Sequence, residues 1–317
     1  MPSIVTHHLF AKDVYRSFER KVSYPHFLIF AQSFDNLFYY QFLTPWTGSD
    51  IRQLGNIGQH QKVNNFFENI ISFIDNNNLQ NNQEIMAFLY GCLCHYILDS
   101  TCHPYVFYYT KSPEIDKSYR GHHEKMEVNL DAYMLWKKEK KILRKENMAD
   151  SLLPKIKFSE PLYQLINYVF SKTFAVDFMG EKYHSSVNTG NFLIKYFVTD
   201  KTGLKKQLYK IKDFLCFWSG RRYEFLSFYV TKIFSEYLND EHEIWCNPWN
   251  NEITSTQSFE ELYEEALQKM LDLILDLEKY WNKQITKDEL LEIIGDNSYA
   301  SGLPWRISKE MKYFKNF

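Results

Sequence analysis

Apolar residues recur at helical spacing along several long stretches of the chain. The clearest example is residues 259–280, where apolar side chains return every three or four positions: Leu262, Ala266, Met270, Ile274 and Leu277. Ser258 followed by Glu261 has the spacing of a capping box, which predicts the start of this helix. The same periodicity predicts further helices over residues 162–174, 204–217 and 223–237.

No series of alternating apolar and polar residues predicts a set of β-strands. Glycine occurs 11 times and proline 9 times in 317 residues, so helix-breaking residues are scarce. The polar stretches "DNNNLQNNQ" (75–83) and "NPWNNEITSTQ" (247–257) are typical of loops. We therefore expect an all-α, multi-helix bundle that forms a single domain over residues 1–317. The helices within residues 150–317 should complete its core.

Residues 83–100 predict an apolar helix that leads into a cluster of ionisable side chains. The stretch has no proline and one glycine, and a helix that is apolar on most sides is usually buried. His95, Asp99 and His103 follow at intervals of four, which places them on one helix face. Pro104 disfavours helical dihedrals at the preceding residue, so we expect the helix to end at His103. Buried ionisable groups are paired or bind a metal, which leaves an internal polar network and a metal site as alternatives.

Composition and charge narrow the classes of function. A chain that is 45% hydrophobic can build a sizeable core, and its formal net charge of −2 argues against a general nucleic-acid binder. We expect no stable nucleic-acid partner. The five cysteines show no disulfide framework, which indicates reduced thiols. Cys92 and Cys94 form a C-x-C pair that is a weak zinc signal, and burial as small apolar side chains is the favoured interpretation.

The first residues lack the features of a secretory signal peptide. No uninterrupted apolar segment reaches the ~18–20 residues that span a bilayer. We therefore expect a cytoplasmic protein without a transmembrane segment, whose contact with a membrane would be peripheral. The basic run "KKEKKILRKE" (137–146) predicts a solvated helix face, with attraction to anionic lipid or phosphate as the alternative.

Residues that can bind a metal are concentrated in the first 131 positions. Eight of the ten histidines lie there: His7, His8, His26, His60, His95, His103, His122 and His123. His123 and Glu127 form a second pair at i, i+4, whereas His122 has no carboxylate at that spacing. Asp35 is the single carboxylate of "AQSFDNLFYY". Histidine and carboxylate side chains together suit zinc.

The order of these residues resembles the zinc-dependent phospholipase C family. "HYILDSTCHPY" is the most specific piece, and "AQSFDNLFYY" and "HHEKMEVNLD" support it in the right order. "THHLF", "HEIWCNPW" and "SGLPW" are similar to the Met-initiated bacterial branch of the family. The resemblance implies an all-helical fold that binds two to three Zn²⁺ ions.

The resemblance also implies a ligand set within residues 1–131. Asp35, His60, His95 and Asp99 would surround one zinc ion, and Asp35 would bridge to a second ion. His103, His123 and Glu127 would hold that second ion. Asp99 and His7 would serve a third ion, with His8 as the alternative to His7. Secreted members complete the third site with an N-terminal tryptophan, whereas this chain begins with Met1 and Pro2.

By this resemblance the protein is a zinc-dependent phosphodiesterase of phospholipase C type, with a phospholipid as substrate and partner. Asp35 would orient or deprotonate the attacking water, and Tyr105, Tyr108 and Tyr109 are candidate substrate contacts. One alternative is an intracellular zinc phosphatase or phosphodiesterase that acts on a soluble phosphate ester or nucleotide. Another is a non-catalytic, zinc-stabilised helical binding protein. Eight ligands for three ions leave open coordination positions, which favours an enzyme.

Overall fold

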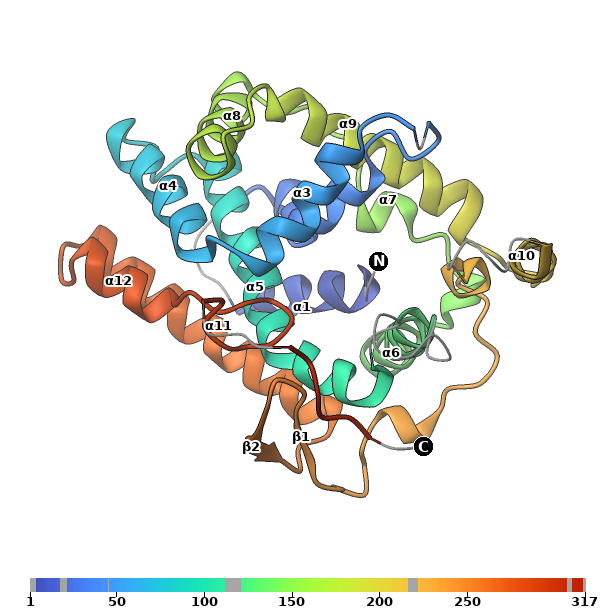
Figure 1. The fold of residues 1–317 in the computed structure, drawn as a ribbon. Helices are drawn as coiled ribbons and strands as arrows, with labels where there is room; N and C mark the ends of the chain where they lie inside the picture. Colours follow the sequence, from blue (N-terminus) through green and yellow to red (C-terminus); the bar gives the residue numbers. More distant parts are fainter. Residues whose placement is uncertain are drawn as a thin grey trace.

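The structure is a computed structural model that describes residues 4–17, 22–44, 46–111, 121–215, 222–306 and 310–315. These residues form α-helices, short 3₁₀ and π turns and one β-hairpin, which confirms the all-α prediction (Figure 1). The α-helices are α1 (Ile4–Arg16), α2 (Tyr24–Phe30), α3 (Ser49–His60), α4 (Val63–Asn76), α5 (Gln83–Thr110), α6 (His122–Glu139), α7 (Ala149–Leu152), α8 (Glu160–Phe174), α9 (Met179–Leu193), α10 (Leu204–Leu215), α11 (Phe259–Trp281) and α12 (Lys287–Ile294). The shorter turns are η1 (Ser33–Tyr39), η3 (Leu143–Lys145), η4 (Ile194–Val198), η6 (Tyr223–Leu226) and η7 (Ser235–Tyr237).

Helix α5 is the central element of the bundle, and helices α1, α2, α6 and α11 pack against it (Figure 1). Among the described residues it is the one helix whose length and apolar composition would allow it to cross a membrane. However, 83% of its most apolar window is buried inside the protein, as expected of a core helix. Asn82 caps its first turn, where the side chain accepts hydrogen bonds from the backbone of Glu84 and Ile85.

Helix α5 continues through Pro104 to Thr110, so the prediction that it ends at His103 was wrong. Proline removes one helical hydrogen bond, a cost of about 3 kcal/mol that burial can offset. Here the turn after Pro104 buries Tyr105 and Val106 in the core. The residue opposite the freed Ser100 carbonyl is Gly302, where a Cβ would collide with that oxygen.

The second half of the chain confirms some predicted elements and corrects others. The capping box of Ser258 and Glu261 starts α11 as predicted. Helices α8 and α10 lie where the periodicity places them, although residues 216–217 fall outside the described residues. The helix predicted over 223–237 was wrong, since this segment contains only the turns η6 and η7. Its first N–H groups, at Tyr223 and Glu224, donate to the buried Asp213 carboxylate instead of starting a helix.

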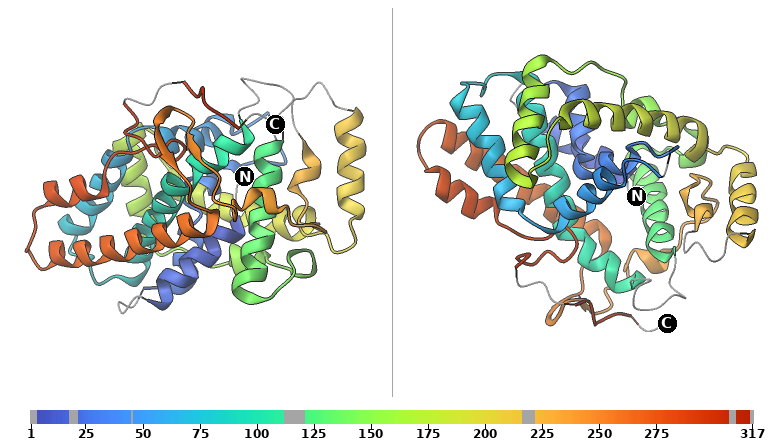
Figure 2. Two further views of the ribbon diagram at one scale, coloured as in Figure 1. Left: turned by 90° about the horizontal axis from the view of Figure 1, so that it is seen from below. Right: turned by 45° about the horizontal axis from the view of Figure 1, so that its top comes forward.

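The loop predicted over residues 247–257 was also wrong, because part of it pairs in a hairpin. Strand β1 (Trp245–Asn247) runs antiparallel to β2 (Asn250–Ser255), with Cys246 opposite Thr254. Most of β2 is exposed, so it shows no buried alternation in the sequence. Strand β1 packs against α5, and α10 lies at the rim of the molecule (Figures 1 and 2).

Candidate metal centre

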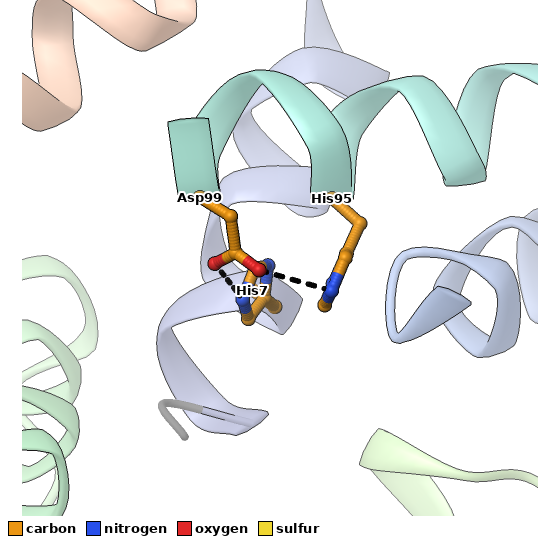
Figure 3. A group of neighbouring side chains, drawn as sticks. All are labelled: His7, His95 and Asp99. Carbon is orange, nitrogen blue, oxygen red and sulfur yellow. Dashed lines mark ion pairs between the residues drawn. The ribbon is translucent and has the colours of Figure 1, made fainter. Parts of the chain in front are cut away.

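Helices α1 and α5 bring His7, His95 and Asp99 together in the protein interior (Figure 3). The Nε2 atom of His7 lies 3.0 Å from Oδ1 of Asp99, and Nε2 of His95 lies 3.1 Å from Oδ2. The two imidazole rings stack with centroids 4.2 Å apart. All three side chains are buried. One carboxylate therefore faces two histidines from two different helices.

A second group lies next to the first and joins α5 to α6. Nε2 of His123 lies 2.7 Å from Oε1 of Glu127, and Nε2 of His103 lies 3.6 Å from the same oxygen. His103 Nε2 is also 3.6 Å from Oδ1 of Asp99. Within each group the ligand atoms lie within 4.8 Å of one another, a compact set of donors. The two groups form one continuous constellation through His103 and Asp99.

Several buried nitrogen and oxygen atoms of these side chains have no hydrogen-bond partner, although they lie close together. Within the described residues, Nε2 of His95, Oδ2 of Asp99 and both carboxylate oxygens of Glu127 lack a hydrogen-bond partner. Buried polar groups are normally satisfied, so such a gathering of unsatisfied donor atoms needs an explanation. Nitrogen and oxygen atoms of this kind are the ligands that zinc takes in proteins. The residues therefore fit a zinc site better than a self-contained polar network.

The other nitrogen of four histidines has a partner that fixes the ring. Nδ1 of His95 lies 3.1 Å from the Ala31 carbonyl, and Nδ1 of His103 lies 3.0 Å from the Tyr299 carbonyl. The corresponding partners of His60 and His123 are the hydroxyls of Ser298 at 3.2 Å and Thr110 at 3.4 Å. A carbonyl only accepts, so Nδ1 of His95 and His103 carries the proton. Their Nε2 lone pairs are then available to a metal, the usual outer-shell arrangement of metal-binding histidines.

The electrostatics favour ionised carboxylates at this centre. Burial opposes ionisation of Asp99, yet His103 and His95 hold its pKa well below the ordinary value. Burial likewise opposes ionisation of Glu127, but His123 and His103 lower its pKa to about 2. For His7 burial dominates and lowers the pKa, with a further contribution from His95. Burial opposes the charged form of His95 and His103, but Asp99 raises the pKa of His95, and Asp99 and Glu127 raise that of His103 to about 9. A metal binds ionised carboxylates and neutral imidazoles, so its binding here would release the protons of His95 and His103.

Asp35 and His60 lie outside these two groups of three, although each lies near one of them. Asp35 is buried in η1, and Gln59 donates a hydrogen bond of 2.5 Å to its Oδ1. Burial raises the pKa of Asp35, while the charge of His95 acts in the opposite direction. For His60, at the end of α3, burial and the charge of His103 lower the pKa.

His8, the alternative to His7, has different surroundings. Burial and the positive charge of Lys12 lower the pKa of His8 to about 4. Lys12 itself pairs with Glu139 at the end of α6. Among the described residues, His7 rather than His8 belongs to a group that could hold a metal.

Two of the tyrosines that follow His103 are buried and hydrogen-bonded within the core. Tyr105 is fully buried and donates to the Tyr237 carbonyl, and the buried Tyr109 donates to Asn239. The prediction that these two residues contact substrate was therefore wrong, because their hydroxyls bind elements of the core. Phe107 lies beside the partly exposed His123, with its ring centroid 4.6 Å from that of the imidazole.

Three residues that hold the candidate ligands or their helices in place were not predicted from the sequence. Tyr299 supplies the carbonyl partner of His103, and Gln59 supplies the donor to Asp35. Asp131 accepts hydrogen bonds from the first turn of α1. Asp131 could have been found from the sequence, because it follows Glu127 at the i, i+4 spacing of one helix face. The position of Tyr299 depends on the tertiary fold alone.

Comparison with known protein families gives a match to one of them. A sequence model of zinc dependent phospholipase C matches residues 6–174, more than half of the chain. The protein belongs to the zinc-dependent phospholipase C family. The match contains both groups of candidate ligands, together with Asp35 and His60. No curated protein and no solved structure matches the chain. Membership supports a zinc phospholipase-type function, and the two groups supply candidate zinc ligands.

Proposed function

We propose that this protein hydrolyses the glycerol–phosphate bond of a phospholipid. The observation that carries the proposal is the joined set of unsatisfied histidine and carboxylate atoms on α1, α5 and α6. In this proposal two to three Zn²⁺ ions bind there. His7, His95 and Asp99 hold one end of the centre, and His103, His123 and Glu127 hold the other. Asp35 and His60 complete the ligand set.

Zinc supplies the electrophilic part of this chemistry, since a bound zinc ion brings the pKa of water to about 7 and stabilises charge on phosphoryl oxygens. The chain supplies the proton acceptor. Burial raises the pKa of Asp35, which makes its carboxylate a stronger proton acceptor. Gln59 holds Oδ1 of Asp35 and thereby orients the carboxyl group.

The substrate approaches, in this proposal, from the side of His123. Its side chain is 19% exposed, compared with 1% for His7 and 0% for His95. Phe107 lies against His123, and the ring of Trp249 lies 5.4 Å from that of Phe107. These two partly buried aromatic rings offer an apolar surface beside the metal ligands, which suits the apolar part of a lipid.

The test is hydrolysis by the zinc-loaded protein and by Asp35→Asn. Phospholipid vesicles and a soluble phosphate diester are assayed in parallel, and zinc is measured by elemental analysis. We expect the substitution to lower hydrolysis at least ~100-fold, the usual contribution of a general base, while most of the zinc is retained. Faster cleavage of the soluble ester than of any phospholipid would show that the substrate is a soluble phosphate ester and not a lipid. Hydrolysis of neither by the zinc-loaded protein would make it a non-catalytic zinc protein.

A further inference from the structure

Helix α10 turns its apolar side to the solvent. Leu204, Leu208, Ile211 and Leu215 follow the i, i+4, i+7, i+11 spacing of a single helical stripe. These four side chains are 64%, 56%, 56% and 59% exposed, and the neighbouring Phe214 is 80% exposed. In all views of Figures 1 and 2, α10 lies at the rim of the molecule. A helix of a soluble protein normally buries this stripe.

The opposite side of α10 is polar and is bound to the rest of the protein. Asp213 is buried and accepts hydrogen bonds from the backbone of Tyr223 and Glu224, at 2.8 and 3.0 Å. Tyr209 donates to the Phe197 carbonyl at 2.9 Å, and Lys206 donates to the Tyr229 carbonyl at 3.0 Å. Rotating the helix to bury its leucines would break these bonds and expose Asp213. The outward orientation of the stripe is therefore specified by the polar contacts.

The charges on α10 are those of a helix that meets an anionic surface. The helix carries four lysines, Lys205, Lys206, Lys210 and Lys212, and its single acidic residue is the inward-facing Asp213. By helical position Lys205 and Lys212 lie along one flank of the apolar stripe, and Phe214 lies along the other. Lys210 and Lys212 are exposed; Lys210 lies farther round the helix, with its Nζ 3.8 Å from Oε2 of Glu224. Lysines beside an apolar stripe can bury their methylene groups and keep the ammonium groups among phosphates.

Aromatic side chains extend this surface next to α10. Phe192 on α9 and Tyr196 and Phe197 on η4 are 38%, 55% and 42% exposed. The rings of Phe192 and Tyr196 lie 4.9 Å apart, and Phe197 is joined to α10 through the hydrogen bond from Tyr209. Aromatic rings are favoured at the boundary between lipid headgroups and acyl chains.

We propose that α10 and these aromatic residues dock the protein on an anionic lipid bilayer. The apolar stripe lies in the headgroup–acyl boundary, and the flanking lysines lie at the level of the phosphates. A protein partner is disfavoured because lysine is depleted in protein interfaces, whereas a basic amphipathic helix with leucine and phenylalanine is typical of lipid binding. This surface is separate from the zinc ligands, so the inference does not depend on the proposed hydrolysis.

The experiment is co-sedimentation of the full zinc-loaded chain with vesicles. One set contains equal parts of phosphatidylcholine and phosphatidylglycerol, and the other contains phosphatidylcholine alone. The test variant is Leu208→Gln with Ile211→Gln on α10. The control is Leu275→Gln with Ile293→Gln on α11 and α12, the same residue types at exposures of 56% and 48%. Because all four side chains are exposed, both variants should fold, which circular dichroism and thermal unfolding verify.

We expect the wild type to prefer the anionic vesicles and to bind less as salt rises. The α10 variant should bind at least about tenfold more weakly, and the control should bind as the wild type does. Hydrolysis of a soluble ester should be unchanged in both variants, so a failure of docking is distinguishable from a failure of the zinc chemistry. Equal binding by both variants, or no preference for anionic vesicles, would overturn the proposal. A wild-type dimer that only the α10 variant converts to a monomer would also overturn it, since the stripe would then join two copies of this chain.

Discussion

Asp131 on α6 caps the first turn of α1 by binding Thr6, which lies 125 residues earlier in the chain. Its Oδ1 accepts hydrogen bonds from both the backbone N–H and the hydroxyl of Thr6, each 2.8 Å long. Its Oδ2 accepts a third from the backbone of Val5 at 3.2 Å. The N–H groups at the start of a helix lack partners within the helix, and Asp131 supplies them. The helix that carries Glu127 thus also holds the turn that carries His7.

Replacement of Asp131 by alanine should therefore affect both stability and zinc binding. Three buried donors lose their acceptor, so we expect a loss of about 1–3 kcal/mol in the free energy of unfolding. The first turn of α1 should loosen, and the protein should retain less zinc when dialysed against a weak chelator. Denaturant unfolding and elemental analysis measure the two effects. Thr6→Val removes one donor and keeps the cap, so it should show a smaller change in both. Unaltered zinc retention in Asp131→Ala would show that the cap does not position His7.

Replacement of a buried candidate ligand should separate metal binding from packing. His95→Asn removes Nε2, which faces Asp99, and should lower the zinc content of the purified protein. A ligand stabilises the folded state by about 4 kcal/mol at ~1,000-fold its Kd, so stripping the zinc should lower the unfolding temperature of the wild type. The variant should respond less to the chelator.

His184→Asn is the matched control for this experiment. His184 is hydrogen-bonded to Tyr163 and to the Ile156 carbonyl, and neither is a candidate ligand. The control should lose stability through these contacts and keep the zinc content of the wild type. Equal zinc in both variants would remove His95 from the metal centre.

The local part of this fold and site followed from the sequence, and the non-local part did not. Spacing alone placed His95, Asp99 and His103 on one face, because helix geometry is set within a few residues. The family resemblance supplied His7 as the partner of Asp99, which periodicity could not provide. The Tyr299 carbonyl on His103 lies 196 residues away in the chain, and no local pattern encodes that contact.

The errors have the same origin. Pro104 disfavours a helix locally, yet burial of the following turn outweighs this preference. Residues 223–237 have helical spacing, but Asp213 and Asp200 bind polar groups of this segment in another arrangement. In both cases tertiary contacts overrode the local propensity.

His8 should contribute to the acid sensitivity of the protein. Burial lowers its pKa from 6.5 to about 4, so between these values the unfolded chain binds more protons than the folded chain. The free energy of unfolding therefore falls as the pH drops from about 6.5 to about 4, by up to about 3 kcal/mol from this residue. In His8→Leu this part of the loss should disappear. The free energy of unfolding of the variant should therefore fall less than that of the wild type as the pH drops.

Denaturant unfolding across this pH range measures the effect. His242→Leu is the control, because the side chain of His242 is 53% exposed. Parallel curves for His8→Leu and the wild type would contradict the prediction. Zinc ligands also lose their metal in acid, but this loss is common to all three proteins and cancels in the difference.

Gly302 should be required for the C-terminal segment to reach the metal centre. Its φ of +64° lies in the left-handed region, and a Cβ there would collide with the Ser100 carbonyl freed by Pro104. Gly295 has a φ of +78°, but the nearest contact of its Cβ would be the Tyr96 hydroxyl at 3.6 Å. Gly295→Ala thus reports the backbone conformation alone, a cost of about 1 kcal/mol. Gly302→Ala adds a clash with a rigid backbone, and we expect a total loss of about 3 kcal/mol or more in the free energy of unfolding.

Gly302→Ala should also weaken zinc retention, because Tyr299 and Ser298 hold His103 and His60 from this segment. Equal losses of stability in the two alanine variants, with zinc retained in both, would show that the close approach of Gly302 to α5 does not support the site.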